Sequence, residues 1–339
     1  MKRLRVLALG VLLAACSKKP VPAATGSPAV KYTPIEKNVL WVSEIPSHYK
    51  SANGYGLWSQ IYSGLGSNGV GSDKDPAKSY DATLTVACSE RICGKFDNGD
   101  DGWTFTLRFA VTPKGASAPT LDFTVEAGSL KMEYVSKKMP VRVVAMDHLM
   151  NDERTKLAPA LIAAALGVKV AVPDVLKGCL KAATRETAVA ALKAGGWAPA
   201  SEAEKAAWAI GTGDKAAIAA TGDAAVDAAM SVLSGSFPRS DDVALLAPVL
   251  AEVRTPRAGE AQAKVLTAVV DGKTLALAPG SLLLLVRALE HDGAADALPA
   301  LEKITAGKAS TFYDELKTQE VRDAATKTAS AIRARTGGK

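Results

Sequence analysis

The sequence predicts an α+β fold: an antiparallel β domain at residues 38–150 followed by an all-α domain at residues 151–339. Three observations lead to this expectation. Apolar and polar residues alternate in the first segment, which is the period of a strand with one buried face. From about residue 151 the apolar spacing becomes helical. Alanine dominates the second half, whereas aromatic residues gather largely before residue 135. A shift of this size favours two architectures in one chain.

The expected strands of the β domain are separated by short turn sequences. Alternation is clearest at residues 103–109. The other strand-like segments are 83–88, 121–125, 130–134 and 141–146. Turns rich in Asn, Asp, Gly and Pro connect several of them, so we expect antiparallel hairpins packed on one face. The glycine-rich residues 51–79 predict a long loop that carries the aromatic side chains of Tyr55, Trp58 and Tyr62.

The all-α segment contains short apolar-periodic stretches divided largely by glycine. In one of them Val243, Leu246, Ala247 and Leu250 share a helix face. The expected helices span residues 152–166, 173–183, 185–194, 201–211, 214–221, 223–234, 241–253, 259–271, 279–290, 294–306 and 314–334. Short helices that cannot each bury an apolar face must stack on their neighbours, and such stacking predicts an α-solenoid.

The end of the chain carries a resemblance to a known repeat. Residues 297–304 read Ala-Leu-Pro-Ala-Leu-Glu-Lys-Ile, and residues 321–325 read Val-Arg-Asp-Ala-Ala. This pair of segments resembles the two helices of a HEAT repeat over residues 285–335, with a degenerate likeness over 185–272. The resemblance implies a HEAT-like solenoid with an extended concave face for protein partners. An irregular helical bundle is the alternative, because the units are shorter than the roughly 40–47 residues of HEAT repeats.

The N-terminus has the pattern of a secretory signal. Lys2, Arg3 and Arg5 precede the uncharged residues 6–15, a run too short to span a membrane. The sequence Leu13-Ala14-Ala15-Cys16 that ends this run resembles the lipobox of bacterial lipoproteins. The resemblance implies a signal peptide at residues 1–15, cleavage before Cys16, and a Cys16 that carries acyl chains such as palmitate. An ordinary secreted protein is the alternative.

The lipobox resemblance also predicts where the protein is found. Ser17 follows the cysteine in place of Asp, which by resemblance implies lipid anchoring in the outer membrane of the cell envelope. Residues 16–37 contain four prolines among small and polar residues, and we expect an extended tether there. The bilayer, reached through lipidated Cys16, is therefore one expected partner.

The charge of the chain argues against nucleic acid as a partner. The formal net charge is +6, and three of the basic residues belong to the expected signal peptide. No run of five or more basic residues occurs.

Cysteine usage points to one expected disulfide. Cys88 and Cys93 flank the four residues of an expected hairpin tip, and export would favour oxidation. We therefore expect a Cys88–Cys93 bridge, with free thiols and a zinc site as the alternatives. Cys179 lies among apolar residues and is expected to be a buried thiol.

The motifs for catalysis, cofactors and metals are all incomplete. Residues 97–102 match part of a calcium loop but have Arg108 where the bidentate acid should stand. Residues 64–69 match a Gly-x-Gly-x-x-Gly fingerprint, and we expect no helix after it. No Gly-x-Ser-x-Gly or His-Glu-x-x-His occurs. We therefore expect no catalytic, cofactor-binding or metal-binding residue.

These observations predict a non-enzymatic envelope lipoprotein that binds proteins or acts as a scaffold. The expected contacts are the face of the helical repeats and the aromatic side chains of Tyr55, Trp58 and Tyr62. A structural or assembly accessory of an outer-membrane complex is the alternative. An envelope hydrolase that uses His148 with Asp147 and Asp152 is a further alternative.

Overall fold

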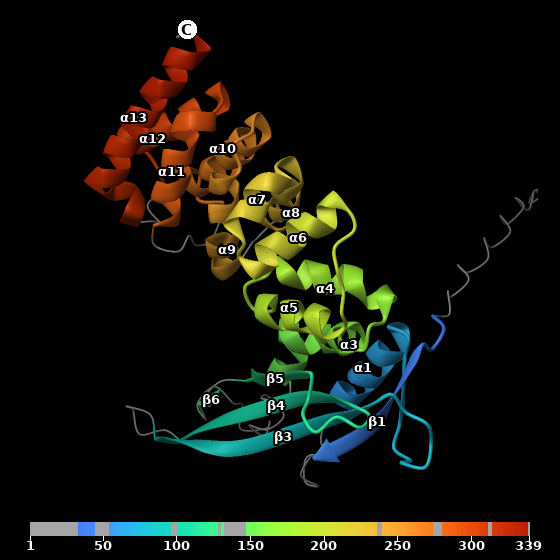
Figure 1. The fold of residues 1–339 in the computed structure, drawn as a ribbon. Coiled ribbons are helices and arrows are strands. Elements are labelled where there is room, and N and C mark those ends of the chain that lie inside the picture. The colour runs from blue at the N-terminus through green and yellow to red at the C-terminus, as the bar shows by residue number, and fades with distance from the viewer. Residues whose placement is uncertain are drawn as a thin grey trace, which may run out of the picture. The chain divides into compact units, whose positions relative to one another are not determined.

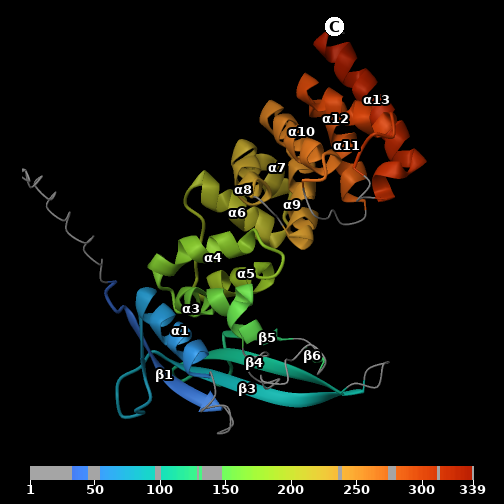
Figure 2. The ribbon, with the colours of Figure 1, turned by 180° about the vertical axis from the view of Figure 1, so that it is seen from behind.

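The structure is a computed structural model in which the residues from Thr33 to Lys339 form one compact unit (Figures 1 and 2). It describes residues 33–44, 54–95, 101–127, 130–131, 147–235, 239–273, 280–310 and 314–337. Of these, residues 54, 55, 89–95, 101–105, 130 and 131 are described by their backbone only. The expected signal peptide, most of the expected tether and the expected strand at 141–146 lie outside the described residues.

Six strands of the described chain form one mixed sheet. They are β1 (Lys37–Glu44), β2 (Val70–Asp73), β3 (Ala82–Lys95), β4 (Asp101–Pro113), β5 (Leu121–Glu126) and β6 (Leu130–Lys131). The order is β2-β1-β3-β4-β5, with β6 paired to β4. β1 runs parallel to both β2 and β3, whereas β3, β4 and β5 are antiparallel. The expectation of a wholly antiparallel sheet is therefore wrong at β1 and β2.

The antiparallel part of the sheet follows the alternation in the sequence. Leu107, Phe109 and Val111 on β4 are fully buried, and the intervening Arg108 is exposed. The β3–β4 ladder runs from Ala82 opposite Pro113 to Lys95 opposite Asp101. One face of the sheet is thus apolar and covered, while Arg108 pairs with Asp122 of β5 on the other face at 2.6 Å.

Helix α1 (Gly54–Ser67) lies where the sequence predicts a loop, and that prediction is wrong. Leu57, Ile61 and Leu65, spaced by four residues, are all fully buried. A parallel pair such as β1 and β2 needs a crossover connection, and α1 supplies it. Glycine weakens a helix by about 1 kcal/mol relative to alanine. Tertiary burial of one face therefore outweighs a low local propensity in α1.

All the helices expected from the apolar period are present, with ends within a few residues. They are α3 (Glu153–Ala165), α4 (Val172–Cys179), α5 (Arg185–Ala194), α6 (Glu202–Thr212), α7 (Lys215–Thr221), α8 (Asp223–Leu233), α9 (Ser240–Glu252), α10 (Pro256–Val270), α11 (Ser281–Asp292), α12 (Leu298–Thr305) and α13 (Gln319–Thr336). Most of these helices contact the next helix and the next but one in the chain (Figure 1). Several begin at a side-chain cap, among them Asp152, Ser201 and Thr255.

The sheet and the first helices share one hydrophobic core. This core extends from Val39 on β1 to Leu285 on α11. A second cluster joins α10 to α13, from Ala263 to Ile332. Because α3 contacts α1, β4 and β5, the sheet and the helices are continuous through buried side chains.

The expected Cys88–Cys93 disulfide is wrong. Both cysteines lie on β3, and a strand rises by about 3.3 Å per residue, which places their Cα atoms roughly 16 Å apart. A disulfide needs Cα atoms within about 7 Å. The β3–β4 ladder continues past both residues to Lys95, so the hairpin tip lies beyond them. Cys88 is a buried free thiol, as is Cys179.

The first prediction concerns the packing of α1. A Cβ at Gly64 would lie 2.5 Å from Cγ of Pro159, whereas a Cβ at Gly66 would meet nothing within 4 Å. Gly64→Ala should therefore lower the free energy of unfolding by roughly 1–3 kcal/mol through overpacking. Gly66→Ala, in the same helix, should raise it by roughly 0.5–1 kcal/mol. Urea denaturation followed by circular dichroism measures both, and equal effects of the two substitutions would contradict the packing.

The second prediction concerns the thiols. Burial raises the pKa of Cys88 to about 11 and that of Cys179 to about 12. Because the thiolate is the reactive form, both should resist iodoacetamide at pH 8 in the folded protein and react after unfolding. Trypsin cuts at Arg91, so a Cys88–Cys93 bridge would join two peptides in a non-reducing digest. The joined peptides should be absent, and their detection would refute the strand geometry.

Candidate functional site

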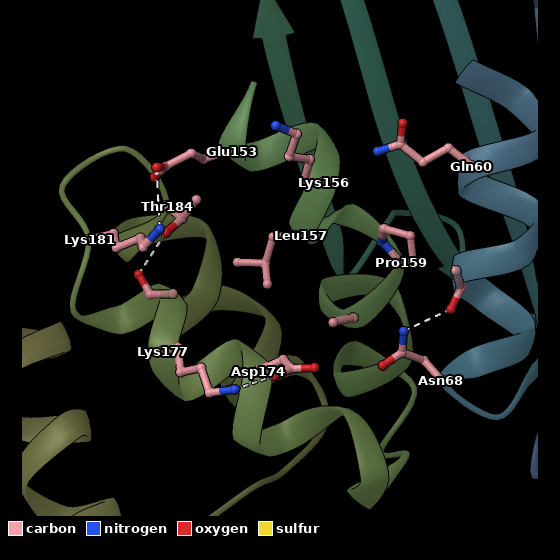
Figure 3. A pocket seen from close by; sticks show the side chains of 13 residues that line it. Gln60, Asn68, Glu153, Lys156, Leu157, Pro159, Asp174, Lys177, Lys181 and Thr184 are labelled. Carbon is pink, nitrogen blue, oxygen red and sulfur yellow. Dashed lines mark hydrogen bonds and ion pairs between the residues drawn. The ribbon is translucent and has the colours of Figure 1, made fainter. Parts of the chain in front are cut away.

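A groove with a volume of about 620 Å³ lies between α1, α3 and α4 (Figure 3). Gln60 of α1 and Asn68, which follows that helix, contribute amide groups to the rim. α3 contributes the floor and part of the rim, and α4 with the turn after it contributes charged side chains. The lining residues are Gln60, Gly64, Asn68, Glu153, Lys156, Leu157, Pro159, Ala160, Asp174, Lys177, Gly178, Lys181 and Thr184.

The floor of the groove is apolar because two glycines let neighbouring helices approach α3. Pro159 and Ala160 of α3 are buried, and the half-buried Leu157 points into the groove (Figure 3). A Cβ at Gly178 would lie 2.6 Å from Cδ2 of Leu157. Together with the contact between Gly64 and Pro159, this close approach draws three helices around one apolar strip.

Two of the three lysines on the rim have an acidic partner. Lys177 pairs with Asp174 one helical turn away at 2.8 Å, and this hydrogen bond raises the pKa of Lys177. Lys181 pairs with Glu153 at 3.3 Å. Exposed pairs of this kind contribute about 0–1 kcal/mol each, so an incoming charge can exchange with them at little cost.

Lys156 is the rim lysine whose side chain makes no ion pair or hydrogen bond with any described residue, and it is exposed. With respect to the described residues, one charge on this rim is therefore open to a ligand.

Glu153 adds an acceptor at the same rim. Its Oε1 accepts a hydrogen bond from the ammonium group of Lys181 and lies 3.7 Å from the guanidinium of Arg239. Its Oε2 is buried and accepts no hydrogen bond from any described residue. A buried polar atom without a partner costs free energy, and this one is shielded from solvent.

The turn at residues 181–184 forms one wall of the groove and is fixed from two sides. The hydroxyl of Thr184 donates to the carbonyl of Gly178 at 2.7 Å. The backbone N–H of Ala182 donates to Oδ1 of Asp242 on α9 at 2.8 Å. Asp242 is 5% exposed, so this hydrogen bond lies largely out of water. The wall is thereby held in one conformation.

The aromatic residues expected to contact a partner are used largely in packing. Tyr62 stacks on Trp41 of β1 with ring centroids 4.5 Å apart, and burial raises the pKa of its hydroxyl. Trp58 is half-buried against the same core. Tyr55 lies on α1, where only its backbone is described. Trp58 and Tyr62 keep part of their surface exposed, and a partner contact by these aromatic residues stays a prediction. The expected lipidation site, Cys16, lies outside the described residues.

The geometry around His148 does not support the hydrolase alternative. The ring of His148 is exposed and makes no hydrogen bond or ion pair with a described residue. Asp152 instead caps α3, where it accepts from the backbone N–H of Arg154 at 2.8 Å and pairs with its side chain. The two residues are therefore not assembled into a catalytic pair.

The groove was not found from the sequence. Lys177 and Lys181 are four residues apart on an expected helix, which predicts a basic face. Nothing in the sequence pairs that face with Gly64, because residues 51–79 predict a loop. Comparison with protein-family models, with curated proteins and with solved structures gives no match.

No group of three or more His, Cys, Asp or Glu side chains among the described residues is placed to hold a metal ion. No single helix in the described part of the chain is both long and apolar enough to cross a membrane. The pair α7 and α8 meets that criterion only jointly, with a bend of 100° at its break.

The third prediction concerns the wall of the groove. Asp242→Ala leaves the backbone N–H of Ala182 without its acceptor, which should lower the free energy of unfolding by roughly 1–3 kcal/mol. Asp241→Ala removes the neighbouring carboxylate, which is exposed, and should change the free energy of unfolding by less than about 0.5 kcal/mol. Chemical denaturation of both variants measures the difference. An Asp242 variant as stable as the Asp241 variant would contradict the role of this hydrogen bond.

Proposed function

We propose that this chain is an outer-membrane-anchored envelope lipoprotein that binds protein partners as a non-catalytic module or scaffold. One observation carries the proposal. The groove between α1, α3 and α4 combines an apolar floor with a polar rim, and Lys156 on that rim has no acidic partner in the described chain. Binding sites for other molecules have this composition, in which apolar surface contributes affinity and a few polar groups fix orientation.

The rim also explains why the groove suits a protein segment. A carboxylate on the segment can pair with Lys156. An apolar side chain of the segment can cover Leu157 on the floor. A peptide with one acidic and one apolar residue offers both groups, and neither contact requires a bond to be broken.

The helices beyond the groove extend the proposed binding surface. We propose that they form a HEAT-like solenoid, which the pattern of contacts between neighbouring helices supports. In a solenoid each unit packs mainly on its neighbours, which leaves an extended face open to partners. Lipidated Cys16 would hold this face at the membrane, with the proline-rich residues that follow it providing reach.

The fourth prediction tests the anchor. Full-length protein expressed in a bacterium that processes lipoproteins should incorporate labelled palmitate and sediment with membranes. Cys16→Ser should abolish both, because the acyl chains would have no attachment site. Cys179→Ala removes a buried thiol and should leave both unchanged. A Cys16→Ser variant that still carries palmitate would overturn the anchoring proposal.

The fifth prediction tests protein binding. Crosslinking in membranes followed by affinity purification should recover a protein with the wild-type chain, and Lys156→Glu should reduce its recovery at least about threefold. Lys264→Glu is the matched control, because Lys264 is also an exposed helical lysine without an ion pair among the described residues. Equal losses for the two variants would remove the groove from the proposal. A complex of fixed stoichiometry would favour the assembly accessory over a transient binding module.

A further inference from the structure

A second groove adjoins the first. It has a volume of about 460 Å³ and lies between the start of α5 and helices α6, α7 and α9. Its floor is apolar, and charged residues stand on its rim. The lining residues are Ala182, Arg185, Glu186, Ile210, Gly213, Lys215, Ile218, Ala244, Leu245, Pro248, Val249 and Glu252.

The two grooves share one wall, which we call the crest and define as residues 181–184. Lys181 and Thr184 line the first groove, whereas Ala182 lines the second. Ala182 and Ala183 are exposed and lie between Lys181 and the buried Thr184, so the middle of the crest carries two methyl groups. Asp242 fixes the crest through the backbone of Ala182. A chain that lies in one groove can therefore cross to the other over these two methyl groups.

The charges of the second groove resemble those of the first. Lys215 pairs with Glu252 at 2.8 Å, as Lys177 pairs with Asp174 in the first groove. Arg185 is half-buried and makes no ion pair within the described chain, and neither does the exposed Glu186 beside it. We expect a ligand to bring a carboxylate to Lys156 and either sign of charge to the second groove.

We propose that both grooves hold one extended segment of a single protein partner, which places an Asp or Glu side chain at Lys156 and crosses the crest at Ala182 and Ala183. This inference rests on the proposed function and names the form of its ligand. Two contact regions on one segment bind more tightly than either alone, because the second contact forms within the complex. An extended segment also advances about 3.3 Å per residue, which lets a short peptide reach both floors.

A flat anionic bilayer fits these features less well than a peptide. The apolar floors are recessed within the grooves, where a planar surface cannot reach them. The rims also carry Asp174 and Glu252, which would face the negative surface of such a bilayer. A lipid surface is therefore an outcome of the test and not the proposed ligand.

The test places the photocrosslinker p-benzoylphenylalanine in the full-length chain, in its own membranes, at Gln60 of the first groove or at Glu186 of the second. Lys264 serves as the control position, because it is exposed and lines neither groove. Crosslinked peptides are identified by mass spectrometry. Both positions should label one contiguous stretch of one protein, with Asp or Glu in the part that is labelled from Gln60. The control position should not label that stretch.

The outcomes separate this inference from the proposed function. Labelling of a protein from Gln60 alone, or of unrelated stretches from Gln60 and Glu186, would overturn the inference and leave the proposed function standing. Labelling of lipid only, or of nothing, at both positions would overturn both.

A synthetic peptide of the labelled stretch then provides a quantitative check on the purified full-length chain. Ala183→Trp places a bulky side chain on the exposed crest and should weaken binding about tenfold or more, because the peptide can no longer occupy both grooves. Lys156→Glu should weaken it at least about threefold, and Lys264→Glu should leave it unchanged. Unaltered binding by the Ala183 variant, with an unchanged melting temperature, would overturn the single-segment arrangement.

Discussion

The close approach of α1 to α3 is the contact on which the proposed site depends. Pro159 lies inside α3 and projects toward α1, where only a residue without a Cβ can face it, and that residue is Gly64. Gly178 performs the same role between α4 and Leu157. These two contacts bring three helices around one apolar strip and join the sheet to the helices that follow. Without them the groove would have no floor.

The helices differ in how far the sequence predicts them, and the glycines of α1 account for the helix that it does not predict. The helices after residue 151 were predictable because their apolar spacing and several of their caps are local signals. Helix α1 was not, because four glycines lower its propensity and only burial of Leu57, Ile61 and Leu65 stabilises it. The parallel pairing of β1 and β2 depends on that helix as its crossover. Because the sequence does not predict the helix, it does not predict the parallel pairing either.

The groove illustrates a further limit of sequence reasoning. Its rim joins α1 to side chains of α3 and α4 that lie about a hundred residues later, so no spacing in the sequence relates them. The disulfide expected at Cys88 and Cys93 failed for the opposite reason. Their short separation looked like a hairpin tip, but β3 continues past them because its ladder with β4 extends to Lys95. Two cysteines a few residues apart indicate a hairpin tip only where the pairing of the two strands ends between them.

We propose that a protein partner covers the groove between α1, α3 and α4 when the chain is anchored to the membrane. Reductive methylation of lysines tests it directly, with the labelling rate of each lysine compared between intact membranes and the purified full-length chain. Lys156 should be labelled several-fold more slowly in membranes, while Lys264 should be labelled at the same rate in both. Equal rates for Lys156 in the two preparations would contradict the account.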